Sequence, residues 1–287
     1  MENLSNIGVI SSLMERYGFS FSKGLGQNFL INPTVAPRIA EMSGAAPGVG
    51  MIEIGTGFGV LTHELAKRAE KVAAIELDSR LLPVLAETLS EHDNVDIINA
   101  DVLKTDIRAV IEENLGGMPA AVAANLPYYI TSPVIMYLLE SRLPVKSITV
   151  MVQKEAGGRL GAKMGSRQCG AVTAAVNYYA VPEMLFSVSR GSFVPKPNVD
   201  SCVIRLNVRE KPPAEVADEA FFFKVIRGGF SQRRKTLVNS LTAALSLDKG
   251  TVTEAVQAAG LDVNVRPEQL TMEDFAAAAR ELSKAAE

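Results

Sequence analysis

The sequence predicts an α/β protein, in which a mostly parallel sheet with an antiparallel edge precedes a small helical domain. Short apolar runs recur at roughly 25-residue intervals up to residue 152, with helical patterns between them. This alternation is typical of βαβ units and a parallel sheet. Beyond a linker at 211–215, which contains two prolines, only helical patterns remain. We therefore expect a sheet domain over residues 1–210, with a helical extension over 1–45, and a helical domain over 211–287.

The elements of the sheet domain follow in order along the chain. Apolar residues at positions 7, 10, 13 and 14 share one face of a short helix, and a second helix runs from Asn32-Pro33 to about Ser43, where Gly44 ends it. Ser132-Pro133 predicts another helix start, with serine as N-cap and proline at the first position. Buried strands are expected at residues 51–55, 72–76, 95–100, 120–124 and 147–152, and further helices at 60–69 and 80–89.

The pattern changes after residue 152. Residues 153–162 suggest a helix, and residues 172–188 and 202–208 look like two strands that flank a loop. Such a pair would add the antiparallel edge to the sheet. The remaining helices are expected at residues 219–228, 232–245, 252–259 and 272–285, the last capped by Thr271.

The composition is that of a soluble globular protein. The 287 residues are 47% hydrophobic and 21% charged, which allows a sizeable core. No apolar run approaches the ~20 residues of a membrane span. Without such a run, no membrane partner is expected. Two cysteines form no disulfide framework, so a cytoplasmic location is expected. His63 and His92 have no metal-ligand spacing with the cysteines, so no metal is expected.

Charge is distributed unevenly along the chain. Residues 141–240 hold 16 Lys and Arg against 7 Asp and Glu, whereas the remainder holds 13 against 25. Such segregation can place a basic face on a protein whose net charge is −3. A nucleic-acid partner and an ordinary solvated surface both fit this pattern.

A glycine loop follows the first strand of the sheet. Gly55, Gly57 and Gly59 would let the main chain turn tightly and approach a ligand closely. A dinucleotide is the obvious competitor, but Val60 stands where that fingerprint needs its third glycine. Glu53 would also place a carboxylate near a pyrophosphate. A ligand with a positive amino group and no phosphate fits better.

Acidic residues end the next two strands. Glu76 is suited to accept from ribose hydroxyls, and Asp101 from an adenine amine beside the Val102 and Leu103 main chain. S-adenosylmethionine supplies an amino-acid head, a ribose, an adenine and a transferable methyl group. It is therefore the cofactor that the sequence favours, with ordinary capping of strand ends as the alternative.

A second motif, Asn125-Leu126-Pro127-Tyr128, follows the apolar run at residues 120–124. It should lie at the carboxyl end of a strand, where open α/β sheets bind their ligands. The Asn125 side-chain oxygen and the Leu126 carbonyl can each accept one N–H of a planar amine. Pro127 restricts the turn, and Tyr128 offers a ring for stacking.

This arrangement suits methyl transfer to an aryl amine or amide nitrogen. The lone pair of such a nitrogen is delocalised, and two acceptors that hold both hydrogens favour a pyramidal, nucleophilic geometry. No base then has to remove a proton first. An ordinary strand–turn–helix junction with an Asx-turn remains the alternative interpretation of the tetrapeptide alone.

Five motifs in order carry a resemblance to a known family over about residues 22–240. The sequence closely resembles the ribosomal RNA adenine N6-dimethyltransferases, specifically the bacterial small-subunit class (KsgA/RsmA type). Thr56 stands in the glycine loop where proline is equally expected. The motifs are Gly26-Gln27-Asn28-Phe29, Glu53-Ile54-Gly55-Thr56-Gly57-Phe58-Gly59, Asn125-Leu126-Pro127-Tyr128, Phe193-Val194-Pro195-Lys196-Pro197 and Phe230-Ser231-Gln232-Arg233-Arg234-Lys235-Thr236-Leu237.

The resemblance implies a Rossmann-like methyltransferase domain that uses S-adenosylmethionine. It implies dimethylation of two adjacent adenosines in a hairpin loop near the 3′ end of 16S rRNA, within immature 30S subunits, and a role in ribosome biogenesis. A monomer with a helical RNA-binding domain is expected.

The resemblance also implies roles for individual residues. Phe193 would cover the target base opposite Tyr128, and base–aromatic stacking contributes about 1–3 kcal/mol per base. Taken in isolation, Phe193 is better interpreted as a core aromatic. RNA contacts are expected from Lys196, Arg233, Arg234 and Lys235. The catalytic group would be Asn125, Leu126, Pro127, Tyr128 and Phe193, and the cofactor group Gln27, Asn28, Leu30, Glu53, Gly55, Gly57, Glu76, Asp101, Val102, Leu103 and Asn125.

Three alternatives remain open from the sequence. One is the antibiotic-resistance class that methylates 23S rRNA, although Leu126 and the segment at residues 230–237 favour the small-subunit class. Another is a ribosome-assembly factor whose catalysis is secondary. The third is a DNA or protein-glutamine N-methyltransferase, whose motif has proline where Leu126 stands.

Overall fold

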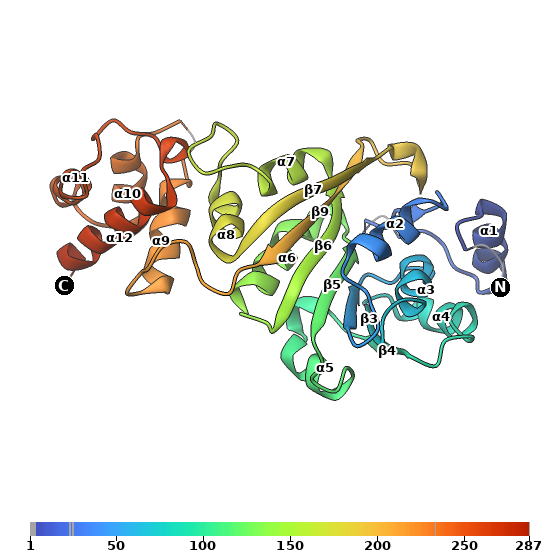
Figure 1. The fold of residues 1–287 in the computed structure, drawn as a ribbon. Coiled ribbons are helices and arrows are strands. Elements are labelled where there is room, and N and C mark those ends of the chain that lie inside the picture. The colour runs from blue at the N-terminus through green and yellow to red at the C-terminus, as the bar shows by residue number, and fades with distance from the viewer. Residues whose placement is uncertain (1–3, 23, 25, 233, 287) are drawn as a thin grey trace. The chain divides into compact units, whose positions relative to one another are not determined.

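The structure is a computed structural model that describes residues 4–22, 24, 26–232 and 234–286. Two compact units make up the chain, and each is described by itself (Figure 1). The first comprises Met1–Gly157 and Pro182–Val208, and the second Gly158–Val181 and Arg209–Glu287. A single boundary after residue 210 was expected from the sequence, and that domain assignment stays a prediction. Residues 158–181 differ, because they belong to the helical unit.

A seven-stranded sheet in the order β4-β3-β2-β5-β6-β9-β7 forms the centre of the first unit. The pairs β2–β3, β3–β4, β2–β5 and β5–β6 are parallel, whereas β9 runs antiparallel to β6. The predicted parallel sheet with an antiparallel edge is therefore confirmed. The strands are β2 (Gly50–Ile54), β3 (Lys71–Glu76), β4 (Val95–Asn99), β5 (Ala120–Asn125), β6 (Val145–Gln153), β7 (Ala180–Val188) and β9 (Ser201–Val208).

The register of the sheet aligns the ends of its central strands. Ile54 of β2 pairs with Ile75 of β3 on one side and with Ala124 of β5 on the other. The side chains that follow these three strands therefore gather at one edge. Because β2 has β3 on one side and β5 on the other, this edge is also where the strand order reverses, the usual ligand position in open α/β sheets.

The helices of the first unit mostly match the predicted ranges. The strand-end turn differs, because the 3₁₀ turn η4 (Tyr128–Ile130) precedes α6, which begins at Thr131 rather than after Ser132. One helix, α5, was not predicted, although Asp106 caps it by accepting from Arg108 N–H at 2.9 Å. The helices are α1 (Ile7–Arg16), α2 (Val35–Met42), α3 (Val60–Ala66), η2 (Ser79–Leu81), α4 (Leu82–Thr88), η3 (Val102–Lys104), α5 (Ile107–Glu113), α6 (Thr131–Glu140) and α7 (Lys154–Leu160).

Aromatic packing fixes the N-terminal segment of the first unit. The ring of Phe29 lies 4.5 Å from that of Phe58 in the glycine loop, and Phe19 lies 5.6 Å from Phe58. A short antiparallel pair joins β1 (Phe29–Leu30) to β8 (Phe193–Val194). These contacts hold residues 26–29 beside the carboxyl edge of the sheet.

The second unit is helical, and it corrects one prediction. Residues 171–179 form the helix α8 (Ala171–Tyr179) rather than the first half of a strand, and β7 begins only at Ala180. Gly170 is the N-cap of this helix, and its N–H donates to Thr173 Oγ1 at 3.1 Å. Tyr179 then stacks on Phe223 of α9 with ring centroids 5.3 Å apart. An apolar run does not distinguish a buried helix from a strand, and this packing decides between them.

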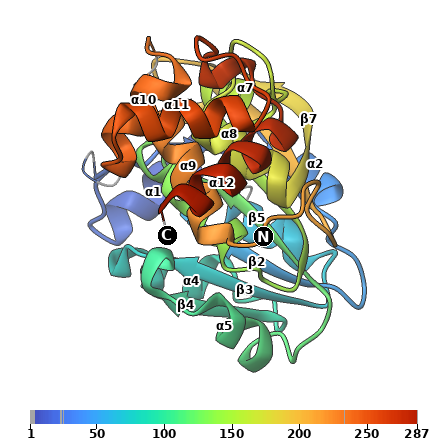
Figure 2. The same cartoon turned by 90° about the vertical axis from the view of Figure 1, so that its left-hand side faces the viewer.

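The remaining helices of the second unit lie together (Figure 2). The predicted helix over 232–245 begins later, at Leu237, because Thr236 caps it by accepting from Asn239 N–H. Within the described part of the chain, no helix is both long and apolar enough to cross a membrane. The helices are α9 (Glu219–Gly229), α10 (Leu237–Leu245), α11 (Lys249–Ala258) and α12 (Met272–Ala286).

Candidate functional site

A pocket opens at the carboxyl ends of β2, β3 and β5. It encloses about 870 Å³ of space, which includes the open solvent at its mouth. The lining combines main chain, apolar side chains and a few polar groups. These residues are Gly26, Gln27, Asn28, Phe29, Ile54, Gly55, Gly57, Ile75, Glu76, Leu77, Leu81, Ala100, Asp101, Val102, Asn125, Leu126, Pro127, Tyr128, Tyr129 and Ile130.

The glycine loop forms the floor of the pocket. Gly55 and Gly57 have φ of +79° and +60°, which side-chain-bearing residues rarely adopt. A Cβ on Gly57 would also lie 3.2 Å from the Phe29 ring. Both positions therefore favour glycine, and the loop lines the pocket with main chain rather than with side chains.

The two strand-end acids line the pocket as predicted. Glu76 is buried and accepts from Gly57 N–H at 2.9 Å and from Asp78 N–H at 2.8 Å. Burial raises the pKa of Glu76, although these main-chain donors oppose the shift. Asp101 caps η3 by accepting from Leu103 N–H at 3.1 Å. The structure therefore brings both acids to the side of the pocket predicted to hold a ribose and an adenine.

Leu103, predicted beside the adenine, is placed differently from its neighbour Val102. Val102 lines the pocket, whereas Leu103 is not among the lining residues and its side chain is exposed. The Leu103 N–H is already bonded to Asp101. Only Asp101 and Val102 of this segment therefore line the pocket.

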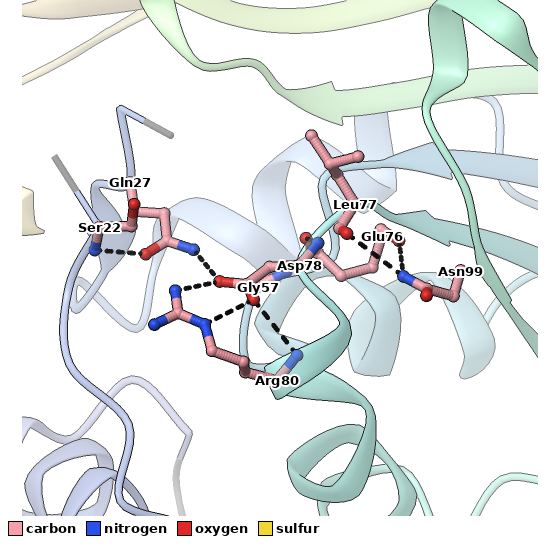
Figure 3. Close-up of polar contacts among 8 residues, drawn as sticks. All are labelled: Ser22, Gln27, Gly57, Glu76, Leu77, Asp78, Arg80 and Asn99. Atoms are coloured by element: carbon pink, nitrogen blue, oxygen red, sulfur yellow. Dashed lines mark hydrogen bonds and ion pairs between the residues drawn. The ribbon is translucent and has the colours of Figure 1, made fainter. Parts of the chain in front are cut away.

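Gln27 and Asn28 form the opposite wall. The Gln27 amide accepts from Ser22 N–H at 2.9 Å and donates to Asp78 Oδ2 at 2.9 Å (Figure 3). The Asn28 amide donates to the Gly26 carbonyl at 3.0 Å. The hydrogen bonds of these two side-chain amides thus hold the Gln27–Asn28 wall in place.

The strand-end motif faces this wall. Asn125 is half-buried at the end of β5, and its Nδ2 donates to the main-chain carbonyl of Asn28 at 3.4 Å. This bond does not use Oδ1, the acceptor that the sequence analysis assigned to a target amine. The Leu126 N–H donates to the Met151 carbonyl of β6 at 3.3 Å, and Pro127 has φ of −55°. The main chain of the motif is therefore held to the sheet.

Two adjacent tyrosines lie at the pocket with different surroundings. Tyr128 is half-buried, and its hydroxyl lies 3.0 Å from Ser201 Oγ in β9. Burial raises the pKa of Tyr128, so its hydroxyl stays protonated at neutral pH. Tyr129 is 56% exposed. Tyr128 is thus fixed by the sheet, whereas Tyr129 presents an open ring face.

Three predicted site residues lie elsewhere. Glu53 is 1% exposed behind the glycine loop, and burial raises its pKa to about 8. Leu30 and Phe193 pair across the β1–β8 ladder and pack into the core with Phe186 and Val203. Phe193 is 2% exposed and is not among the residues that line the pocket. The structure therefore places all three side chains in buried surroundings outside the pocket lining, and their predicted cofactor and stacking roles stay predictions.

The basic residues predicted to bind RNA are exposed. Lys196 lies between β8 and β9, and Arg234 and Lys235 precede α10 in the turn before its N-cap. Arg233 lies outside the described residues. These residues are accessible, and contact with RNA remains a prediction.

The apolar lining of the pocket and one buried acid were not predicted from the sequence. Leu77, Ile75, Ala100 and Ile130 have no chemical signature. Only the positions of the first three at strand ends, and of Ile130 in the turn after β5, could have indicated them. Asp78, two residues beyond Glu76, bonds to Gln27 from a distant part of the chain. No local pattern predicts that contact.

Comparisons with known proteins bear on the family of the chain. The family model described as "Ribosomal RNA adenine dimethylase" matches residues 18–284. "Ribosomal RNA small subunit methyltransferase A" of Geobacillus kaustophilus is 48% identical over 98% of both chains, and the protein of that name from Bacillus cytotoxicus is 49% identical over 96% of both.

Two solved structures are similar over most of this chain. A dimethyladenosine transferase from Plasmodium falciparum gives a TM-score of 0.71 at 25% identity, covering 90% of this chain and 98% of that one. The 23S rRNA methyltransferase ErmE gives 0.65 at 28% identity, covering 89% of this chain and all of the other.

Proposed function

The chain belongs to the ribosomal RNA adenine dimethylase family, and from that premise we propose that it dimethylates N6 of two adjacent adenosines of 16S rRNA. As a member of that family it is an rRNA adenine dimethyltransferase. We propose the identity of the methyl donor, the ribosomal subunit and the position of the two adenosines. The observation that carries it is the Asn125 motif at the end of β5, facing the Gln27–Asn28 wall of one pocket.

We propose S-adenosylmethionine as the methyl donor, because the pocket fits it part by part. The Gly55–Gly57 floor exposes main chain, Glu76 can accept from ribose hydroxyls, and Asp101 can accept from an adenine amine. Leu77 and Val102 supply apolar surface for a ring. When bound, this cofactor supplies an electrophilic methyl group on a sulfonium.

The Asn125 motif would orient the target amine. Asn125 Oδ1 and the Leu126 carbonyl accept its two N–H groups, and the ring of Tyr128 covers one face of the base. The Asn28 carbonyl fixes the amide of Asn125, so the oxygen is preorganised for this task. Positioning of this kind can supply a large part of a rate enhancement without a general base.

The small-subunit assignment rests on the relatives. Proteins named for the small subunit are 48–49% identical over nearly the full chain, whereas the 23S enzyme ErmE is 28% identical. We propose the hairpin loop near the 3′ end of 16S rRNA as the target, presented by immature 30S particles to a monomeric, cytoplasmic enzyme. A base in a loop costs little to unstack, which favours its entry into the pocket.

The test is methyl transfer from labelled S-adenosylmethionine to undermodified 30S particles. We expect N6,N6-dimethyladenosine after digestion to nucleosides, located at two adjacent positions of 16S rRNA. Protein-free 23S rRNA is the matched alternative substrate. Methylation of 23S rRNA with unmodified 30S particles would overturn the subunit assignment, and absence of transfer to both would overturn the proposed reaction.

A further inference from the structure

We propose that Asp78 and Arg80 are positioning residues for the cofactor, which act by holding the Gly26–Phe29 wall against the rest of the pocket. The inference rests on the proposed function in one respect, namely that S-adenosylmethionine occupies this pocket. Neither residue is among those that line the pocket, whereas Glu76 and Leu77 immediately before Asp78 are. Any effect on the cofactor must therefore pass through the residues that they hold.

Asp78 joins two walls of the pocket (Figure 3). Its carboxylate accepts from Gln27 Nε2 at 2.9 Å, and its own N–H donates to Glu76 Oε1 at 2.8 Å. The second oxygen of Glu76 accepts from Gly57 N–H at 2.9 Å. One continuous set of hydrogen bonds therefore runs from the N-terminal wall, through the ribose side, to the glycine floor.

Arg80 holds the carboxylate of Asp78 in place. Its Nε and one terminal nitrogen donate to the two Asp78 oxygens at 2.8 and 2.7 Å, a bidentate geometry. Asp78 is only 6% exposed, and these bonds to Arg80 hold the pKa of its carboxyl below the usual value. The carboxylate is therefore charged and fixed at neutral pH.

The same arginine also contacts the N-terminal segment directly. Its guanidinium lies 4.9 Å from the ring centroid of Phe19, which packs against Phe29 and Phe58. Gln27 accepts from Ser22 N–H on its other side. The wall is thus tied to the sheet by the hydrogen bond between Gln27 and Asp78 and by ring packing at Phe19. Arg80 supports the first by holding Asp78, and the second by its contact with Phe19.

A preformed wall lowers the conformational cost of binding. If Gln27 lost its bond to Asp78, residues 26–29 would have to be ordered when the cofactor binds, and affinity would fall. We expect RNA binding not to depend on these bonds. Their loss should therefore change the affinity and the KM for the cofactor and leave the KM for 30S particles unchanged. This separates a positioning role from general loss of stability.

The test measures S-adenosylhomocysteine affinity by calorimetry in D78N, R80A and R80K, well below each unfolding temperature. Loss of a charge-assisted bond should weaken binding about ten-fold in D78N. We expect a smaller loss in R80A and substantial rescue in R80K, which keeps the cation. The KM for S-adenosylmethionine should rise by the same factor, with kcat and the KM for 30S particles nearly unchanged.

E87Q is the matched control. Glu87 accepts from Tyr17 at 2.5 Å and from Arg16, and so anchors the same N-terminal segment away from the pocket. We expect wild-type cofactor affinity in E87Q. Equal loss in E87Q and D78N, or affinity within two-fold of wild type in both D78N and R80A, would overturn the inference. If D78N does not fold, R80A and R80K decide it. A wild-type protein that binds no S-adenosylhomocysteine would instead contradict the proposed cofactor.

Discussion

The side-chain nitrogen of Asn125 lies 3.4 Å from the main-chain oxygen of Asn28, to which it donates a hydrogen bond. This contact joins the end of β5 to the N-terminal wall, across 97 residues of sequence. It also fixes the orientation of the Asn125 amide, because a carbonyl oxygen can accept from the amide nitrogen and not from the amide oxygen. This bond leaves the oxygen of Asn125 for another partner, and the target amine is the partner that we propose.

Asn125→Ala should abolish methyl transfer while leaving binding of 30S particles nearly intact. The substitution removes one acceptor for the amine and the tie to Asn28, and misplacement of this kind costs at least about 10²-fold. Single-turnover transfer and equilibrium binding to 30S particles would be measured side by side. Equal losses in the two assays would contradict a role confined to positioning the amine.

Tyr128→Phe should be mild and Tyr128→Ala severe. Phenylalanine keeps the ring that covers the base and loses the 3.0 Å contact with Ser201, whose net contribution is about 1 kcal/mol. Alanine removes the stacking surface itself. The kcat of each variant and of Ser201→Ala checks this. If Tyr128→Phe were as inactive as Tyr128→Ala, the hydroxyl rather than the ring would be the important group.

Phe193→Leu should leave activity per folded molecule close to wild type. In this structure the ring belongs to the core, so leucine should cost about 1 kcal/mol of stability, and Phe193→Tyr more, because its hydroxyl would enter apolar surroundings. A stacking role predicts the reverse order, with Tyr active and Leu inactive. Unfolding in urea combined with methylation kinetics distinguishes the two.

The buried acid Glu53 predicts a specific pH dependence of stability. Its pKa is about 8 in the folded protein against an ordinary value of 4.5, so the folded state alone keeps this proton between those pH values. Stability should therefore fall as pH rises through that window, by on the order of 1 kcal/mol per pH unit. The stability of Glu53→Gln should not show this fall between those pH values. Denaturant midpoints at pH 5.5 and 8 measure it, and parallel profiles for the two proteins would refute it.

Replacing Arg234 and Lys235 with glutamine should reduce the salt dependence of RNA binding. Each lost phosphate contact lowers the slope of log affinity against log salt by about 0.7–0.9. Titrations of 30S binding over a series of KCl concentrations give the slope. Lys249→Gln, an exposed lysine in α11, is the control. A slope equal to that of wild type would assign the pair to contacts within the protein.

Much of the fold could be predicted because its signals are local. Apolar runs predicted the parallel strands, and the capping residue Thr271 predicted the start of α12. The failure at residues 171–179 shows the limit, because an apolar segment fits either a buried helix or a strand. The rings of Phe222 and Phe223, more than 40 residues further along the chain, favour the helix by packing against Tyr178 and Tyr179.

The sequence by itself determined the class of sheet, the order of the motifs and the chemistry of the strand-end residues Asn125, Glu76 and Asp101. These follow from residue type and from spacing along the chain. Only the tertiary structure decided that Phe193 and Glu53 are buried and that Gln27 is held by Asp78. Burial and long-range hydrogen bonds depend on which distant segments meet, and that is a property of the packed chain.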